Sequence, residues 1–160
     1  MRIFSIPTLF LGLLTATQAT AANDVFGRWV VENGKAVIEL YPCAENACGR
    51  LVWLQNPFMP NGQPKRDEKN QDPALVHRPI CGLQLVSGLR PDGDGAWQDG
   101  EIYSTRHGKS FGLELRPAGS DVLKVRGYLG FSLFGSTQTW ERDDGIRGNC
   151  VQLRKPGQDR

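Results

Sequence analysis

The regular spacing of turn residues is the feature of this sequence that most constrains its fold. Short β-rich segments, each bounded by Gly, Pro, Asn or Asp, recur between residues 26 and 142. No segment has the apolar period of a three-turn helix, and no internal repeat is visible. We recognise seven or so such segments, at 26–32, 36–41, 49–55, 95–104, 109–115, 121–128 and 136–142. This rhythm predicts an all-β fold, a small antiparallel meander that closes into a barrel or folds into a sandwich.

The N-terminal residues have the composition of a secretory signal peptide. One positive charge precedes an apolar stretch at residues 3–14, and small residues of the A-x-A type follow at Ala19 and Ala21. The apolar stretch is shorter than the roughly 18 to 20 residues that a transmembrane helix needs. We therefore expect residues 1–22 to be a signal peptide, residues 23–160 to form a single domain, and the protein to be periplasmic or secreted.

The charge balance excludes some classes of partner. The chain has 19 Lys and Arg against 17 Asp and Glu, so it offers no broad cationic surface for nucleic acid. No second apolar run has the length of a transmembrane segment. Phosphate-binding loops, dinucleotide fingerprints and zincin motifs are absent from the sequence, and we expect no cofactor.

The four cysteines, Cys43, Cys48, Cys81 and Cys150, are best interpreted as two disulfides in an exported protein. The sequence YPCAENACGR has the pattern of a hairpin that brings Cys43 and Cys48 within disulfide reach across the loop AENA. Cys81 would then pair with Cys150. A zinc site is the alternative, although no C-x-x-C motif is present.

A proline-rich segment at residues 56–82 interrupts the strand rhythm. Its five prolines and its KRDEK cluster exclude a central strand over most of its length. A segment this long in a small domain is either functional or a solvated crossover in which Asp67, Asn70 and Asp72 cap turns. The same three residues are also a weak candidate for an oxygen-ligand metal site, and we assign no metal.

Signatures of catalysis are incomplete. The G-x-S-x-G pattern around Ser132 fails because Phe134 stands where the second glycine is required. A calcium-loop pattern at residues 92–97 lacks its later ligand and its glycine. His77 and His107 are the only imidazole bases, and both lie in polar, turn-like contexts. We assign no catalytic residue, and a hydrolase is the least favoured function.

The last β-rich segment carries polar residues on its apolar face. If Trp140 points inward, the period of two carries Gln138 and Arg142 to the same side. Buried amide and guanidinium groups need partners. Either the barrel holds a wet or ligand-filled cavity, or Arg142 closes one end by stacking on an indole such as Trp29. The alternative is that Trp140 packs outward under a loop.

Several motifs together resemble a family of small exported bacterial proteins classed as a domain of unknown function, the DUF2147 type. The resemblance spans nearly the whole mature chain and is carried by FGRW, Asp67-x-x-Asn70, Asp72-Pro73, Arg78-Pro79, Gly82-Leu83, Gly100-x-Ile102-Tyr103, Gly108-Lys109 and LKVRGYLGFSLFGSTQTWER. It implies a small lipocalin-like β-barrel of about eight strands. Gly27-x-Trp29, together with Arg142, also resembles the pair that closes one end of lipocalins.

A lipocalin-like barrel implies binding of a small apolar or amphipathic ligand in the interior. The candidate ligand-binding residues are Trp29, Trp53, Tyr103, Tyr128, Gln138, Trp140 and Arg142, with Phe131 and Phe134 at the mouth. The alternative is a cell-envelope interaction module. In that case the apolar loop Leu129–Phe134 would dock a partner protein or a membrane surface.

Overall fold

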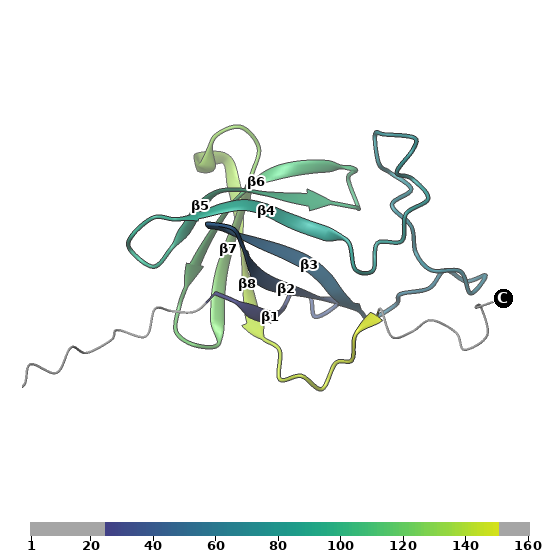
Figure 1. Cartoon of the computed structure of the whole chain (residues 1–160), viewed down its shortest axis with the longest axis horizontal. Helices are drawn as coiled ribbons and strands as arrows, with labels where there is room; N and C mark the ends of the chain where they lie inside the picture. Colours follow the sequence, from purple (N-terminus) through teal and green to yellow (C-terminus); the bar gives the residue numbers. More distant parts are fainter. Residues whose placement is uncertain (1–24, 151–160) are drawn as a thin grey trace, which may run out of the picture.

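A computed structural model describes residues 25–150 of the chain, so the predicted signal peptide lies outside the described residues. Eight strands form one closed barrel in sequence order, which confirms the all-β barrel prediction (Figure 1). The strands are β1 Gly27–Val30, β2 Ala36–Cys43, β3 Asn46–Leu54, β4 Gln84–Pro91, β5 Trp97–Ser104, β6 Lys109–Pro117, β7 Val122–Tyr128 and β8 Gly135–Arg142. A single 3₁₀ turn, η1 Ser132–Phe134, lies between β7 and β8 among these residues. Within the same range, no helix is long and apolar enough to cross a membrane.

Every strand pairs antiparallel with its neighbour, and the barrel closes where β1 pairs with β8. At this seam Trp29 pairs with Arg142, and Val30 pairs with Glu141. The connections define two ends of the barrel. The Arg142 end carries the β2–β3, β4–β5 and β6–β7 connections, and the segment after β8 begins there. The η1 end carries the β1–β2, β3–β4, β5–β6 and β7–β8 connections.

Strand β4 was missed by the sequence pattern because a bulge breaks its alternation. Val86 and Leu89 are both fully buried in the barrel core although they lie three residues apart. Their partners on β3 are Gly49 and Ala47, which are only two residues apart. Gly88 lies between them with a φ of +71°, a conformation in which glycine is not strained. The extra residue on β4 returns Leu89 to the interior.

The turn between β1 and β2 is longer than the two-residue hairpin turn that an Asn-Gly dipeptide such as Asn33-Gly34 usually forms. The Val31 amide donates to the Ala36 carbonyl at 3.0 Å, so four residues form the turn. Gly34 still supplies the left-handed residue, with a φ of +69°. The Asn-Gly dipeptide therefore indicates where the chain turns, but the turn has four residues and not two.

Apolar side chains from seven of the eight strands form the buried core, and β5 contributes the partly buried Trp97 and Ile102. The cluster includes two tryptophans, Trp29 at 1% and Trp140 at 2% exposed, with leucines and valines from the other strands. A smaller cluster, Val30, Val37 and Val52, is separate from it. Because these residues alternate with core residues along their strands, the smaller cluster lies on the outer wall.

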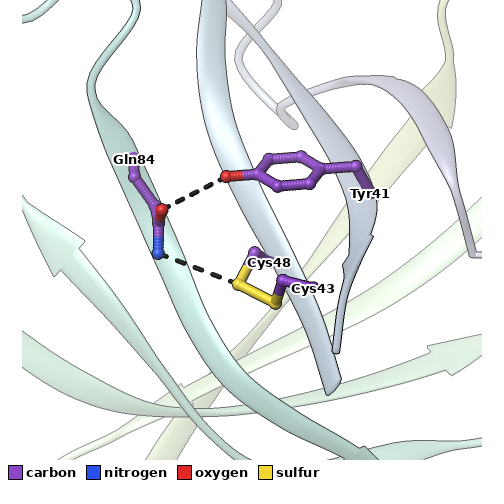
Figure 2. The surroundings of a disulfide bond; sticks show 4 residues. All are labelled: Tyr41, Cys43, Cys48 and Gln84. Atoms are coloured by element: carbon purple, nitrogen blue, oxygen red, sulfur yellow. Dashed lines mark hydrogen bonds between the residues drawn. A yellow bond between two sulfur atoms is a disulfide. The ribbon is translucent and has the colours of Figure 1, made fainter. Parts of the chain in front are cut away.

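Both predicted disulfides are present. Cys43 and Cys48 join across the β2–β3 hairpin, with their Cα atoms 5.8 Å apart. The hairpin loop is two residues long, and the register places Cys43 opposite Asn46 rather than opposite Cys48. Figure 2 shows Gln84 of β4 beside this bond, where it accepts a hydrogen bond from the Tyr41 hydroxyl at 3.2 Å. The bond therefore lies where β2, β3 and β4 meet.

The second disulfide joins Cys81, at the end of the long segment, to Cys150, after β8. Arg28 holds the same C-terminal stretch by an ion pair with Asp143 at 2.7 Å and a hydrogen bond to Asn149 at 2.8 Å. The chain after β8 is therefore fastened across the outer wall, beyond the barrel strands at the bottom of Figure 1.

Candidate functional site

Arg142 closes one end of the barrel. Its guanidinium carbon lies 4.0 Å from the centre of the Trp29 ring. Nη1 donates to the Phe26 carbonyl at 2.7 Å, and Nη2 donates to the Ser120 carbonyl at 2.9 Å. The Trp29 indole NH donates to the Val25 carbonyl at 2.7 Å. Of the two arrangements that the sequence left open, the stacked pair is the one observed, and it occupies both side chains.

The closed end of the barrel requires a glycine at position 27, two residues before Trp29. The φ of Gly27 is +108°, and a β-carbon there would lie 2.9 Å from Arg142 Nη1. Glycine is favoured both by the backbone conformation and by the close approach of the guanidinium. The Gly27-x-Trp29 pattern is therefore a requirement of the closed end and does not mark a ligand contact.

Trp140 points into the barrel, as predicted, and Gln138 lies on the same face nearer the η1 end. The indole NH donates to Gln138 Oε1 at 3.0 Å, which satisfies a buried donor. Gln138 itself is exposed, and it pairs across the sheet with the buried core residue Val125. Gln138 is thus a polar group on the inward face at the point where the packed core ends.

Three predicted lining residues do not face the interior. Trp53 packs with the outer cluster that includes Val37, and the Arg147 guanidinium lies 5.7 Å from its ring centre. Tyr128 pairs with Gly112, and its ring occupies the space where a β-carbon of Gly112 would stand, at 2.3 Å. Tyr103 turns away to bond Asp67. Strand bulges and hydrogen-bond partners determine which way these three side chains point, and the composition of the strands does not reveal it.

The loop between β7 and β8 presents four large apolar side chains to solvent. Leu129 is 52% exposed, Phe131 75%, Leu133 87% and Phe134 80%. Arg126 fixes the loop from below, because its Nε donates to the Ser132 carbonyl at 2.8 Å. Phe131 and Phe134 are therefore at the η1 end, as predicted, but they lie on the surface rather than folded over the mouth.

The long segment between β3 and β4 is fastened to β5 by a buried carboxylate. Asp67 is fully buried, and its Oδ2 accepts hydrogen bonds from Asn70 at 2.8 Å and from Arg78 Nε and Nη2 at 3.0 and 2.8 Å. The Tyr103 hydroxyl donates to Asp67 Oδ1 at 2.9 Å. Arg78 also lies over the Tyr103 ring, 5.5 Å from its centre. We call these four residues the Asp67 network.

The network shifts two pKa values in opposite directions. Burial alone would raise the pKa of Asp67, but hydrogen bonds from Asn70, Arg78 and Tyr103, together with the charge of Arg78, hold it below its usual value. Burial, and then the bond to Asp67, raises the pKa of Tyr103. Both shifts favour an ionised Asp67 beside a neutral phenol at neutral pH.

The outcome for the long segment differs from residue to residue. Asn70 and Asp72 do cap turns, since Asn70 Oδ1 accepts from the Asp72 amide and Asp72 Oδ1 accepts from the Ala74 amide. Asp67 instead joins the buried network. Between residues 25 and 150, no three acidic, histidine or cysteine side chains gather as a metal site would require.

Neither histidine lies in a catalytic arrangement. His107 and His77 are both exposed. His107 Nδ1 lies 2.9 Å from the Ser104 hydroxyl within one turn, and its ring packs edge-on against Phe111. A base needs an orienting partner as well as a nucleophile. The contact between His107 and Ser104 joins two residues of one turn, and it does not provide that arrangement.

A surface groove of about 280 Å³ lies on the outer wall, over β5 to β8. Trp97, Glu114, Arg116, Lys124 and Arg126 are among the residues that line it. It includes none of the predicted ligand-binding residues. Any ligand in this groove would bind outside the barrel.

Comparisons with known proteins agree with this fold. Residues 27–142 match the family described as "Uncharacterized protein conserved in bacteria (DUF2147)". A solved structure titled "Protein HP1028 from the human pathogen Helicobacter pylori belongs to the lipocalin family" aligns with a TM-score of 0.66 at 20% identity, over 75% of this chain and 83% of that one. No curated protein matches the sequence. At this identity the structural match shows a shared fold.

Proposed function

Because the chain belongs to the bacterial family DUF2147 and has a lipocalin-like fold, we propose that it binds a small apolar or amphipathic molecule at the η1 end of its barrel. Fold alone does not fix function, so the proposal depends on the distribution of side chains between the two ends. The Arg142 end is filled by buried residues and a stacked cation. The η1 end has apolar side chains that pack against the core and stay partly exposed.

One observation carries the proposal. Seven apolar side chains pack against the core yet remain partly exposed. Two of them, Phe26 and Trp97, contact each other edge-on at the Arg142 end, and the other five lie close to the η1 end of a strand. They come from five successive strands or the turn beside them, and they are Val31, Ala36, Leu54, Leu85 and Ile102. We call them the apolar ring. Partly exposed apolar groups with a few polar neighbours are the usual composition of small-ligand sites.

Gln138 supplies the polar contact beside the ring. Its amide is exposed on the inward face, and within residues 25–150 only its Oε1 is engaged, by the Trp140 indole. The amide NH₂ is left to donate to a ligand carbonyl, carboxylate or hydroxyl. An amphipathic molecule with an apolar body over the ring and a polar group at Gln138 fits this arrangement. Trp29, Trp140 and Arg142 then act as the floor and have no direct ligand contact.

Native mass spectrometry of protein purified from its source without detergent tests the proposal. We expect a reproducible additional mass that is lost on denaturation. Ile102→Arg places a charge in the apolar ring and should abolish the additional mass, while Ile146→Arg, at an exposed site beyond β8, should retain it. The proposal fails if wild-type protein carries no bound mass and takes up no alkyl-chain fluorophore.

The site of action that we propose is the periplasm or the exterior of the cell, with residues 23–160 as the mature single domain. Two disulfides support an oxidising compartment. Sequencing the N-terminus of the exported protein checks this, with a mature start near residue 23 expected. A cytoplasmic protein that retains its first residues would contradict it.

A further inference from the structure

We infer that the η1 end docks on an anionic lipid bilayer and inserts the side chains of Leu129, Phe131, Leu133 and Phe134 into its interface. This inference concerns a second surface and goes beyond the proposed binding of a small molecule. It arises from two independent features of this end of the barrel. One is an apolar protrusion, and the other is the distribution of charge between the two ends.

The protrusion has the shape expected for insertion. Its four large side chains occupy a six-residue connection, and each is more than half exposed. In Figure 1 the connection between β7 and β8 lies beyond the ends of the strands at the top of the barrel. A concave surface would favour a small ligand, whereas an exposed apolar tip on a folded base is suited to a bilayer interface. Arg126 provides that base through its bonds to Ser132 and Thr137.

The two ends of the barrel differ in net charge. Within residues 25–150, the connections at the η1 end contain six basic and four acidic residues, a balance of +2. The three connections at the Arg142 end contain no basic and four acidic residues, a balance of −4. An anionic surface therefore attracts the η1 end and repels the other. The end that is attracted is also the end that carries the apolar protrusion.

Three of the cations are exposed and available to lipid headgroups. Lys35, Lys69 and Arg106 lie on three different connections of the η1 end, and their side chains make no hydrogen bond or ion pair within the described part of the chain. Two of these connections pack together, because Gly108 lies so close to Lys69 that a β-carbon would contact its carbonyl oxygen. Lys69 and Arg106 therefore lie on connections that pack against each other.

These features favour a lipid surface over a protein partner. A protein interface of ordinary stability buries about 800 Å² on each side and needs a broad complementary surface. The protrusion offers four side chains on a short loop, and the exposed cations of the same end are spread over several connections. Each basic residue near an anionic membrane contributes about 1 kcal/mol, or roughly fivefold in binding. Apolar insertion and headgroup attraction act together in such cases.

Vesicle co-sedimentation tests the inference with the purified protein. We expect binding to vesicles of phosphatidylglycerol and phosphatidylethanolamine, weak binding to pure phosphatidylcholine, and weaker binding at 0.5 M salt because charges are then screened. The double variant Phe131→Ser with Phe134→Ser should bind roughly 100-fold more weakly, given the apolar area that it removes. The triple variant Lys35→Gln, Lys69→Gln and Arg106→Gln should lose a similar factor on anionic vesicles.

Matched variants at other sites serve as controls. Ile146→Ser removes a similarly exposed apolar side chain from the segment after β8, and Arg116→Gln removes an exposed cation on the outer wall. Both should bind vesicles like wild type. Equal binding to neutral and anionic vesicles, or unchanged binding by the Phe double variant, overturns the inference. So does retention by a protein extract but not by protein-free vesicles.

The two proposals fail in different ways. The Phe double variant should still carry the small molecule detected by native mass spectrometry, and Ile102→Arg should still bind anionic vesicles. Near-ultraviolet circular dichroism of each variant confirms that the barrel is folded. A folded Phe double variant that loses the bound molecule but keeps its vesicle binding contradicts the assignment of this loop to lipid.

Discussion

Replacing Asp67 by Ala should destabilise the protein more than any surface change on the same segment. The substitution removes four hydrogen bonds to a fully buried carboxylate, and it leaves the Arg78 guanidinium beside the Tyr103 ring without its counter-charge. Breaking a buried ion pair costs about 3–5 kcal/mol. Because the Arg78 side chain is 31% exposed and regains some solvation, we expect a loss of about 2–4 kcal/mol in the free energy of unfolding.

Urea unfolding followed by tryptophan fluorescence measures this loss. Asp72→Ala is the matched control, because Asp72 is an exposed aspartate on the same segment that caps only a turn. We expect the control to lose about 1 kcal/mol or less. If Asp67→Ala also loses less than 1 kcal/mol, the network does not fasten the segment to the barrel, and our account of the segment is wrong.

The same carboxylate predicts a pH dependence with a definite sign. The pKa of Asp67 is lower in the folded state, so its contribution is complete above the unfolded value of about 3.9 and is lost as the pH falls through the folded pKa. The difference in stability between wild type and Asp67→Asn should therefore be constant near neutrality and should shrink below about pH 4. A difference that grows on acidification would contradict the direction of the shift.

Three further substitutions test the frame of the barrel, each by urea unfolding. Arg142→Ala should lower the free energy of unfolding by about 1–3 kcal/mol, because it removes the stack on Trp29 and two hydrogen bonds to carbonyl groups. Arg142→Lys should not restore this stability, because an ammonium group lacks the planar face. Full rescue by Arg142→Lys would exclude a role for the planar stack. Cys81→Ala with Cys150→Ala should cost about 2–4 kcal/mol, since the bond closes a long loop, and an unchanged midpoint would show that the C-terminal stretch is held without it. Gly108→Ala should cost about 2–4 kcal/mol, because its φ is +66° and a β-carbon would overlap a backbone oxygen; a stable variant would show that the turn can move away.

Much of the frame could be predicted from the sequence, because turn chemistry and alternation are local properties. The strand rhythm and the Cys43–Cys48 disulfide follow from residues near one another in sequence, and the Cys81–Cys150 disulfide follows by elimination. The stack of Arg142 on Trp29 was one of the arrangements that the alternation of the last strand left open. Strand β4 could not be recognised, since the bulge at Gly88 removes the period of two. A bulge is set by the partner strand, which the local pattern does not contain.

The candidate site was less predictable, because large aromatic residues occur on both faces of a small barrel. Trp53 and Tyr128 suit a lining by composition, yet one packs in an outer cluster and the other covers Gly112. Some members of the Asp67 network could be recognised in the sequence, since Asp67, Asn70 and Tyr103 are in motifs that carry the family resemblance. Their meeting depends on a long segment folding back on β5, which no local pattern encodes.

The most direct test of the central claim is to map where a bound molecule lies. Backbone amide chemical shifts of the ¹⁵N-labelled protein can be followed during titration with the molecule released from the native protein, or with a medium-chain fatty acid in its absence. If the molecule binds at the η1 end, shifts are expected at Gln138, at Ile102 and at the other members of the apolar ring. Shifts confined to Trp97, Lys124 and Arg126, which line the outer groove, would contradict it, as would a titration that perturbs no amide at the η1 end.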